Sequence, residues 1–91
     1  MTEQKKQIAL VIGATRGIGA AIAQALAERG YTVIGTATTD AGAQRIGEAL
    51  AAHGGRGVNL NVNDAVGVDA LMDSIVKTEG ALHVLVNNAG I

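Results

Sequence analysis

The sequence predicts an α/β fold built on a parallel sheet, and three observations carry this prediction. Four short apolar segments rich in Val, Ile and Leu alternate with three segments of helical periodicity. A glycine stop follows each helical segment, at Gly30, Gly54 and Gly80. The 91 residues include 13 glycines and no proline, which suits many short turns. Such an alternation forms parallel sheets with right-handed crossovers.

The first strand is expected over residues 7–12, where apolar residues follow one another. A helix is expected over residues 16–29. The apolar residues that we expect on its buried face are spaced i, i+4, i+7 and i+8: Ile18, Ile22, Ala25 and Leu26. The second strand is expected over residues 31–36, which are rich in β-branched side chains.

A second helix is expected over residues 40–53, with Thr39 or Asp40 as its N-cap. The third strand is expected over residues 57–62. The predicted buried stripe of the second helix consists of Ala43, Ile46 and Leu50.

The third helix is expected over residues 65–79, capped by Asn63 or Asp64, and the fourth strand over residues 82–87. The side chains of this helix that we expect to face inward are Val68, Leu71, Met72 and Ile75. Half of a doubly wound sheet would have the strand order 3-2-1-4, with helices on both faces. Because a further helix and strand would normally cover the fourth strand, we expect the chain to be part of a longer protein.

Composition excludes several classes of function. The net charge of −1 indicates no nucleic-acid partner, and the absence of cysteine excludes disulfides and thiolate metal sites. The two histidines, His53 and His83, lie far apart, so we expect no histidine metal site. No apolar stretch approaches membrane-spanning length, and residues 1–7 are polar, so we expect a cytoplasmic location and no membrane partner.

A glycine-rich turn separates the first strand from the first helix: Gly13-Ala14-Thr15-Arg16-Gly17-Ile18-Gly19. A strand, such a turn and a helix start together form the arrangement that binds a dinucleotide pyrophosphate. The glycines allow a tight turn and a close approach of the backbone to the phosphates. The helix start offers unpaired N–H groups and the positive end of the helix dipole.

The glycine spacing, Gly13-x-x-x-Gly17-x-Gly19, resembles the glycine motif of the short-chain dehydrogenase/reductase family. Asn87-Asn88-Ala89-Gly90 resembles the second hallmark of that family. The resemblance implies a Rossmann-type domain, of which residues 1–91 would be the N-terminal, NADP-binding part. A purely structural role for glycine, ending helices and forming turns, explains Gly30, Gly54 and Gly80. It does not explain why the glycine motif and the Asn-Asn-Ala-Gly motif both follow strand ends.

Further segments are similar to one branch of this family, the 3-oxoacyl-[acyl-carrier-protein] reductases of bacterial fatty-acid synthesis. These segments are Val33-Ile34-Gly35-Thr36-Ala37-Thr38, Gly42-Ala43-Gln44, Leu60-Asn61-Val62 and Leu85-Val86-Asn87-Asn88-Ala89-Gly90-Ile91. The resemblance implies NADPH-dependent reduction of a 3-oxoacyl thioester to the 3-hydroxyacyl form. It also implies a homotetramer when full length, and an acyl-carrier-protein thioester bound through the missing part.

Two alternatives remain open. The chain resembles other short-chain reductases as well, which act on acetoacetyl-CoA, sugars or steroids. It would also fit a non-catalytic, truncated dinucleotide-binding or assembly module.

The end of the second strand favours NADPH over NADH. NAD-binding folds commonly place an acid there, which accepts hydrogen bonds from the ribose hydroxyls. Residues 35–38 contain no acid, so nothing there repels a 2′-phosphate. Arg16 would pair with that phosphate, or it is a solvated surface charge, and Thr38 would add a hydroxyl. Asp40 is interpreted as a helix cap.

The family resemblance assigns the remaining cofactor contacts. Asn61 and Val62 would lie beside the adenine, although Asn61 is equally well explained as a turn residue. Asn88 would lie beside the ribose together with Ala89, and Gly90 would leave room for the cofactor or backbone. Asn87 is expected to tie the fourth strand to its neighbours.

The chain departs from the family at Ile12, where the family usually has threonine before the first glycine. A threonine hydroxyl there can bond to nearby backbone, and isoleucine cannot. We interpret this departure as tolerated variation, because both side chains are β-branched and suit a strand.

The catalytic residues implied by the resemblance are a serine and a Tyr-x-x-x-Lys pair. The sole tyrosine, Tyr31, is followed four residues later by Gly35 and not by lysine. The sole serine, Ser74, is expected on the surface of the third helix. No catalytic residue can therefore be placed, and the 91-residue chain alone is predicted to be inactive.

Overall fold

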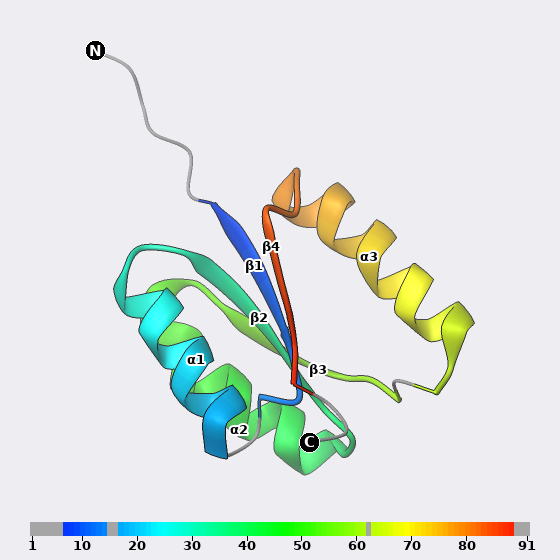
Figure 1. Cartoon of the computed structure of the whole chain (residues 1–91), viewed down its shortest axis with the longest axis horizontal. Helices are drawn as coiled ribbons and strands as arrows, with labels where there is room; N and C mark the ends of the chain where they lie inside the picture. The colour runs from blue at the N-terminus through cyan, green and yellow to red at the C-terminus, as the bar shows by residue number, and fades with distance from the viewer. Residues whose placement is uncertain (1–6, 15–16, 62, 89–91) are drawn as a thin grey trace.

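The computed structural model describes residues 7–14, 17–61 and 63–88. Its four parallel strands follow the order β3-β2-β1-β4, which confirms the predicted order (Figure 1). The elements are β1 (Ile8–Ile12), α1 (Gly17–Glu28), β2 (Thr32–Ala37), α2 (Asp40–Leu50), η1 (Ala51–His53), β3 (Arg56–Asn59), α3 (Ala65–Glu79) and β4 (Val84–Asn87).

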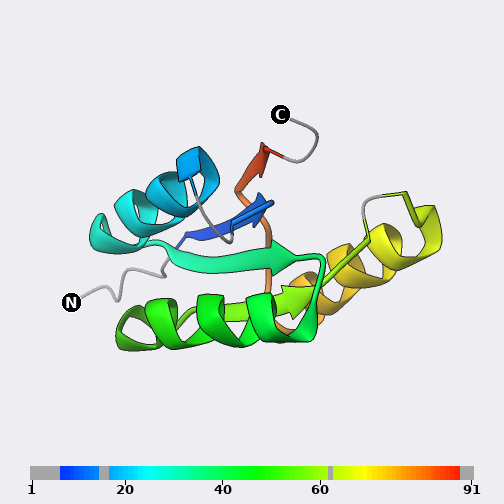
Figure 2. The same cartoon turned by 90° about the horizontal axis from the view of Figure 1, so that it is seen from below.

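The helices cover both faces of the sheet. Helices α1 and α2 lie together on one side of the strands, and α3 lies on the other side (Figure 1). The arrowheads of β1, β2 and β3 all point the same way in Figure 2. The carboxyl ends of the strands therefore meet at one edge of the sheet.

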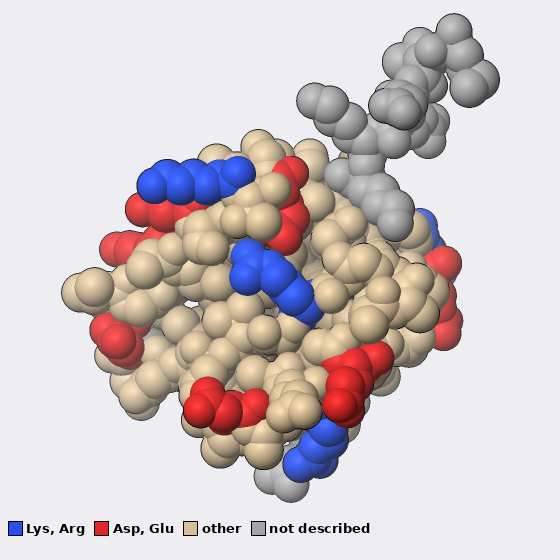
Figure 3. Space-filling view, turned by 180° about the vertical axis from the view of Figure 1, so that it is seen from behind, with Lys and Arg blue, Asp and Glu red and all other residues tan. Residues whose placement is uncertain are grey.

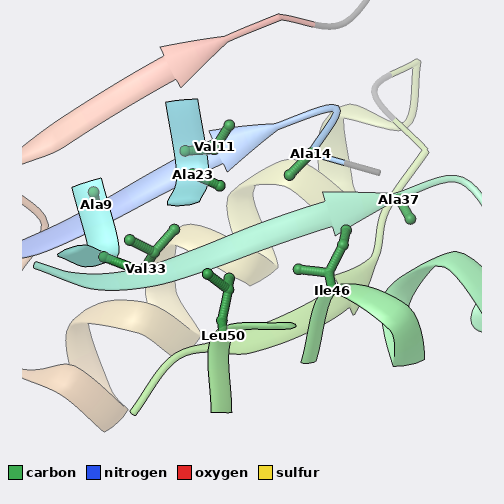
Figure 4. Packing of buried hydrophobic residues seen from close by; sticks show 9 residues of the cluster. Ala9, Val11, Ala14, Ala23, Val33, Ala37, Ile46 and Leu50 are labelled. Carbon is green, nitrogen blue, oxygen red and sulfur yellow. The ribbon is translucent and has the colours of Figure 1, made fainter. Parts of the chain in front are cut away.

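Strand β1 is buried along its whole length because helices cover it on both sides. Its alternate residues Ala9 and Val11 face α1 and α2, where they pack with Val33 and Leu50 (Figure 4). The other residues of the strand face α3: Ile8, Leu10 and Ile12. A continuous apolar run is the pattern that this two-sided burial requires.

The predicted buried face of α1 is wrong at two of its four positions. Ile18 is 64% exposed and Ala25 is exposed, whereas Ile22 and Leu26 are only partly buried. The residues of α1 that are buried are Gly19, Ala23 and Ala27. Small side chains on this face let the helix backbone lie close to the sheet, and the spacing of large apolar residues does not reveal such a face.

Side-chain caps begin the other two long helices. The Thr39 hydroxyl accepts a hydrogen bond from the Gly42 N–H at 3.0 Å, and Asp64 accepts one from the Gly67 N–H at 3.1 Å. Asp40, the alternative cap, is instead the first residue of α2. Its carboxylate accepts a hydrogen bond from Asn59 Nδ2 at 2.8 Å.

Replacing Thr39 by alanine is expected to lower the free energy of unfolding by about 1 kcal/mol, because an N–H of α2 loses its capping acceptor. Thr39→Ser keeps the hydroxyl and should stay close to wild type. Urea denaturation of the three proteins measures the difference. Equal loss in both variants would contradict the capping role.

Three predicted element boundaries need correction. Helix α2 ends at Leu50 and continues only as the 3-10 turn η1 to His53. Strand β3 ends at Asn59 rather than at residue 62, although the Leu60 N–H still donates to the Ala37 carbonyl at 2.8 Å. Strand β4 begins at Val84. Just before it, the His83 N–H donates to the Ile8 carbonyl at 2.9 Å. The Ile8 N–H donates in turn to the side-chain Nδ1 of His83 at 2.9 Å.

Candidate cofactor-binding site

The candidate site lies at the carboxyl edge of the sheet. The segments that follow β1, β2, β3 and β4 at this edge contain Gly13, Thr38, Asn61 and Asn88, respectively. Strand β1 is continued by α1 on one face of the sheet, whereas its neighbour β4 is reached from α3 on the other face. This reversal is the topological switch point at which open α/β sheets bind their ligands.

The turn after β1 is fastened to β2. Gly13 has a φ of 82°, a conformation that favours glycine. Its N–H donates to the hydroxyl Oγ1 of Thr36 at 3.1 Å, and the Ala14 N–H donates to the Thr36 carbonyl at 2.9 Å. The sequence patterns did not single out Thr36. The signal that could have found it is a hydroxyl in the buried, otherwise apolar stretch of residues 33–37.

The same turn is fastened to the end of β4. The Asn88 N–H donates to the Ile12 carbonyl at 3.0 Å, and Asn88 Nδ2 donates to the Gly13 carbonyl at 3.4 Å. A Cβ on Gly19 would overlap the Gly13 carbonyl oxygen and lie 2.7 Å from Asn88 Nδ2. The structure thus brings together Gly13, Gly19 and Asn88, three of the residues that the sequence predicts to contact the cofactor.

The beginning of α1 suits an anion. Gly17 is exposed with a φ of 65°, and the first turn of the helix contains no acidic residue. The first N–H groups of a helix have no acceptor within it and carry the positive end of its dipole. A pyrophosphate group therefore fits the chemistry of this turn.

Thr38 and Asn61, which follow β2 and β3 at the same edge of the sheet, are both exposed. Asn61 Oδ1 accepts a hydrogen bond from the Asn63 N–H at 2.9 Å, so Asn61 does serve as a turn residue. The nearest acid in the sequence beyond β2, Asp40, is hydrogen-bonded to Asn59. The predicted contacts of Thr15, Arg16, Val62, Ala89 and Gly90 lie outside the described residues and stay predictions.

Other kinds of site find no support in the described part of the chain. Residues 7–14, 17–61 and 63–88 contain no group of three or more His, Cys, Asp or Glu side chains that could hold a metal ion. No helix described there has both the length and the apolar character needed to cross a membrane. On the face drawn in Figure 3, described Lys and Arg side chains are interspersed with Asp and Glu.

The strand order and the helices on both faces of the sheet define an α/β fold of the Rossmann type. The family model described as short chain dehydrogenase matches residues 7–91. This chain belongs to that family of oxidoreductases.

Within this family, the chain is similar to curated relatives that are 3-oxoacyl-[acyl-carrier-protein] reductases. The chain is 54% identical over 85 residues to the 3-oxoacyl-[acyl-carrier-protein] reductase FabG of Vibrio harveyi, and 52% identical over 85 residues to that of Escherichia coli K12. It is 47% identical over 87 residues to the FabG of Pseudomonas aeruginosa. Each match covers 93% of this chain. The chain spans about a third of the length of these relatives, 34% for the first two and 35% for the third.

Proposed function

We propose that this chain supplies the cofactor-binding part of an NADPH-dependent reductase that converts a 3-oxoacyl-[acyl-carrier-protein] to its 3-hydroxyacyl form. The observation that carries the proposal is the Gly13 turn, held between β2 and β4 at the switch point of the sheet. Similarity to the FabG relatives supports the choice of substrate. Residues 1–91 would then be the N-terminal part of one NADP-binding domain.

The residues that would hold the cofactor divide into three groups. The turn and helix start of residues 13–19 would bind the pyrophosphate, while Arg16 and Thr38 would face the 2′-phosphate. Asn61 and Val62 would lie beside the adenine, and Asn88, Ala89 and Gly90 beside the ribose. Bound NADPH would supply a hydride to the substrate carbonyl. The protonating residues would come from outside these 91 residues, and the active protein would be a homotetramer.

Changing Thr38 to aspartate is expected to reverse the cofactor preference. A carboxylate at the end of β2 would repel the 2′-phosphate and accept hydrogen bonds from a free ribose hydroxyl. Two charges about 6 Å apart near a protein surface interact by roughly 2–3 kcal/mol, so the Kd for NADPH should rise at least about tenfold. Thr38→Asn has a side chain of similar size without the charge and serves as the control. A Thr38→Asp variant with an unchanged ratio of Kd values would contradict this placement.

The experiment that tests the function uses the natural protein that contains these residues. NADPH oxidation is followed at fixed enzyme concentration with an acetoacetyl-acyl-carrier-protein substrate, with acetoacetyl-CoA, and with sugar and steroid ketones. Preferred turnover of the carrier-protein thioester with NADPH supports the proposal. Turnover of a sugar or steroid ketone alone would favour a different short-chain reductase, and saturable NADPH binding with no turnover would favour the binding module.

A further inference from the structure

Thr36 and Ile12 occupy neighbouring places on the same face of the sheet. Ile12 packs with Ile34 in the cluster that α3 covers. Thr36 follows Ile34 by two residues on β2, so its side chain lies on that face too. The register pairs Val11 with Gly35, which makes Ile12 and Thr36 the next pair along the two strands.

The hydroxyl of Thr36 accepts a hydrogen bond from the glycine turn that follows β1. Thr36 is only 1% exposed, so water cannot easily replace its hydrogen bonds. Its Oγ1 accepts from the Gly13 N–H at 3.1 Å, while Asn88 Nδ2 donates to the Gly13 carbonyl at 3.4 Å. Gly13 is therefore held on its N–H side by β2 and on its carbonyl side by the end of β4.

The isoleucine before the first glycine provides no hydroxyl, yet the turn is hydrogen-bonded to one from the adjacent strand. We infer that Thr36 is a positioning residue for the cofactor: its hydroxyl fixes the orientation of the Gly13 peptide, from which the pyrophosphate-binding turn begins. This inference rests on the function proposed above. Thr36 acts through Gly13, whereas Thr38 is proposed to face the 2′-phosphate.

The two roles predict different effects on the two cofactors. NADPH and NADH share the pyrophosphate, so loss of the Thr36 hydroxyl should weaken the binding of both by the same factor. Loss of the Thr38 hydroxyl should weaken the binding of NADPH and leave the binding of NADH unchanged. A general loss of stability would change the fraction of folded protein but would not single out the Gly13 amide.

The test compares Thr36→Val, Thr36→Ser and Thr38→Val in the natural protein that contains this chain. Valine keeps the shape of threonine without its hydroxyl, and serine keeps the hydroxyl. The measurements are hydrogen–deuterium exchange at the Gly13 amide and the Kd for NADPH and for NADH. One lost hydrogen bond to the partly buried Gly13 N–H corresponds to roughly a tenfold change. For Thr36→Val we expect the exchange rate at Gly13 and both Kd values to rise by this factor. Thr36→Ser should remain close to wild type, within about twofold, because it retains the acceptor.

Two results would overturn the inference: a folded Thr36→Val variant with wild-type exchange and both wild-type Kd values, or a serine variant as impaired as the valine variant. If the valine variant does not fold, exchange in the wild type decides, since an unprotected Gly13 amide contradicts the hydrogen bond. A wild-type protein that binds neither cofactor refutes the proposed function. In that case, exchange at Gly13 in the valine and serine variants still decides whether Thr36 positions the turn.

Discussion

Replacing Gly19 by alanine is expected to destabilise the protein by about 3 kcal/mol and to weaken NADPH binding at least about tenfold. The new Cβ would overlap the Gly13 carbonyl oxygen and lie 2.7 Å from Asn88 Nδ2. The Asn88 side chain can rotate away from the new Cβ, but the Gly13 carbonyl is backbone, and its residue is held by the hydrogen bond from the Gly13 N–H to Thr36. The helix start must therefore shift away from the turn. Urea denaturation and NADPH titration measure the two effects.

Gly47 provides a matched control within α2. A Cβ at Gly47 would have its nearest neighbour, the Gly57 nitrogen, at 3.6 Å, which is ordinary contact. Gly47→Ala should be neutral or stabilise the protein by up to about 1 kcal/mol, because alanine has the higher helix propensity. If Gly19→Ala matched this control in stability and in NADPH affinity, the close approach of α1 to the turn would be refuted.

The second large effect is expected for Ile75→Ala, at about 3 kcal/mol of lost stability. Ile75 is 0% exposed and packs in the cluster that contains Leu10 and Ile34, on the face that α3 covers. Removing most of its side chain leaves a cavity that the surrounding strands cannot fill without moving. Thermal and chemical denaturation measure the loss, and the Kd for NADPH of the remaining folded protein should change little.

The adjacent Val76 gives the control for Ile75. Val76 is 51% exposed, so Val76→Ala should change the stability by no more than about 0.5 kcal/mol. Both variants shorten a β-branched residue on α3, so the difference between them reports burial. Equal losses would show that α3 is not seated on the sheet through Ile75.

Local patterns account for the parts of the fold that were predicted correctly. The order of strands and helices, the capping by Thr39 and Asp64, and the glycine stop at Gly80 all depend on residues a few positions apart. The strand order follows from the connection of parallel strands by right-handed crossovers. The glycine turn was recognised for the same reason, because its residues are consecutive.

The errors and omissions concern contacts between distant segments. The buried face of α1 consists of Gly19, Ala23 and Ala27, because close packing on the sheet requires small residues that carry little signal in a hydrophobic pattern. Asp40 is held by Asn59, 19 residues away, and Gly13 by Thr36, 23 residues away. None of these partners is marked by its neighbours in the chain.

The fold class, the order of the elements, the family and the position of the glycine turn could all be predicted from the sequence, because each depends on residues that lie close together in the chain. The tertiary structure alone decided how that turn is held. Parallel strands connected through helices place Thr36 and Asn88 on either side of Gly13, although Asn88 lies 75 residues away along the chain. A backbone N–H that is partly withdrawn from water needs an acceptor, and only the packed sheet determines which hydroxyl is within reach.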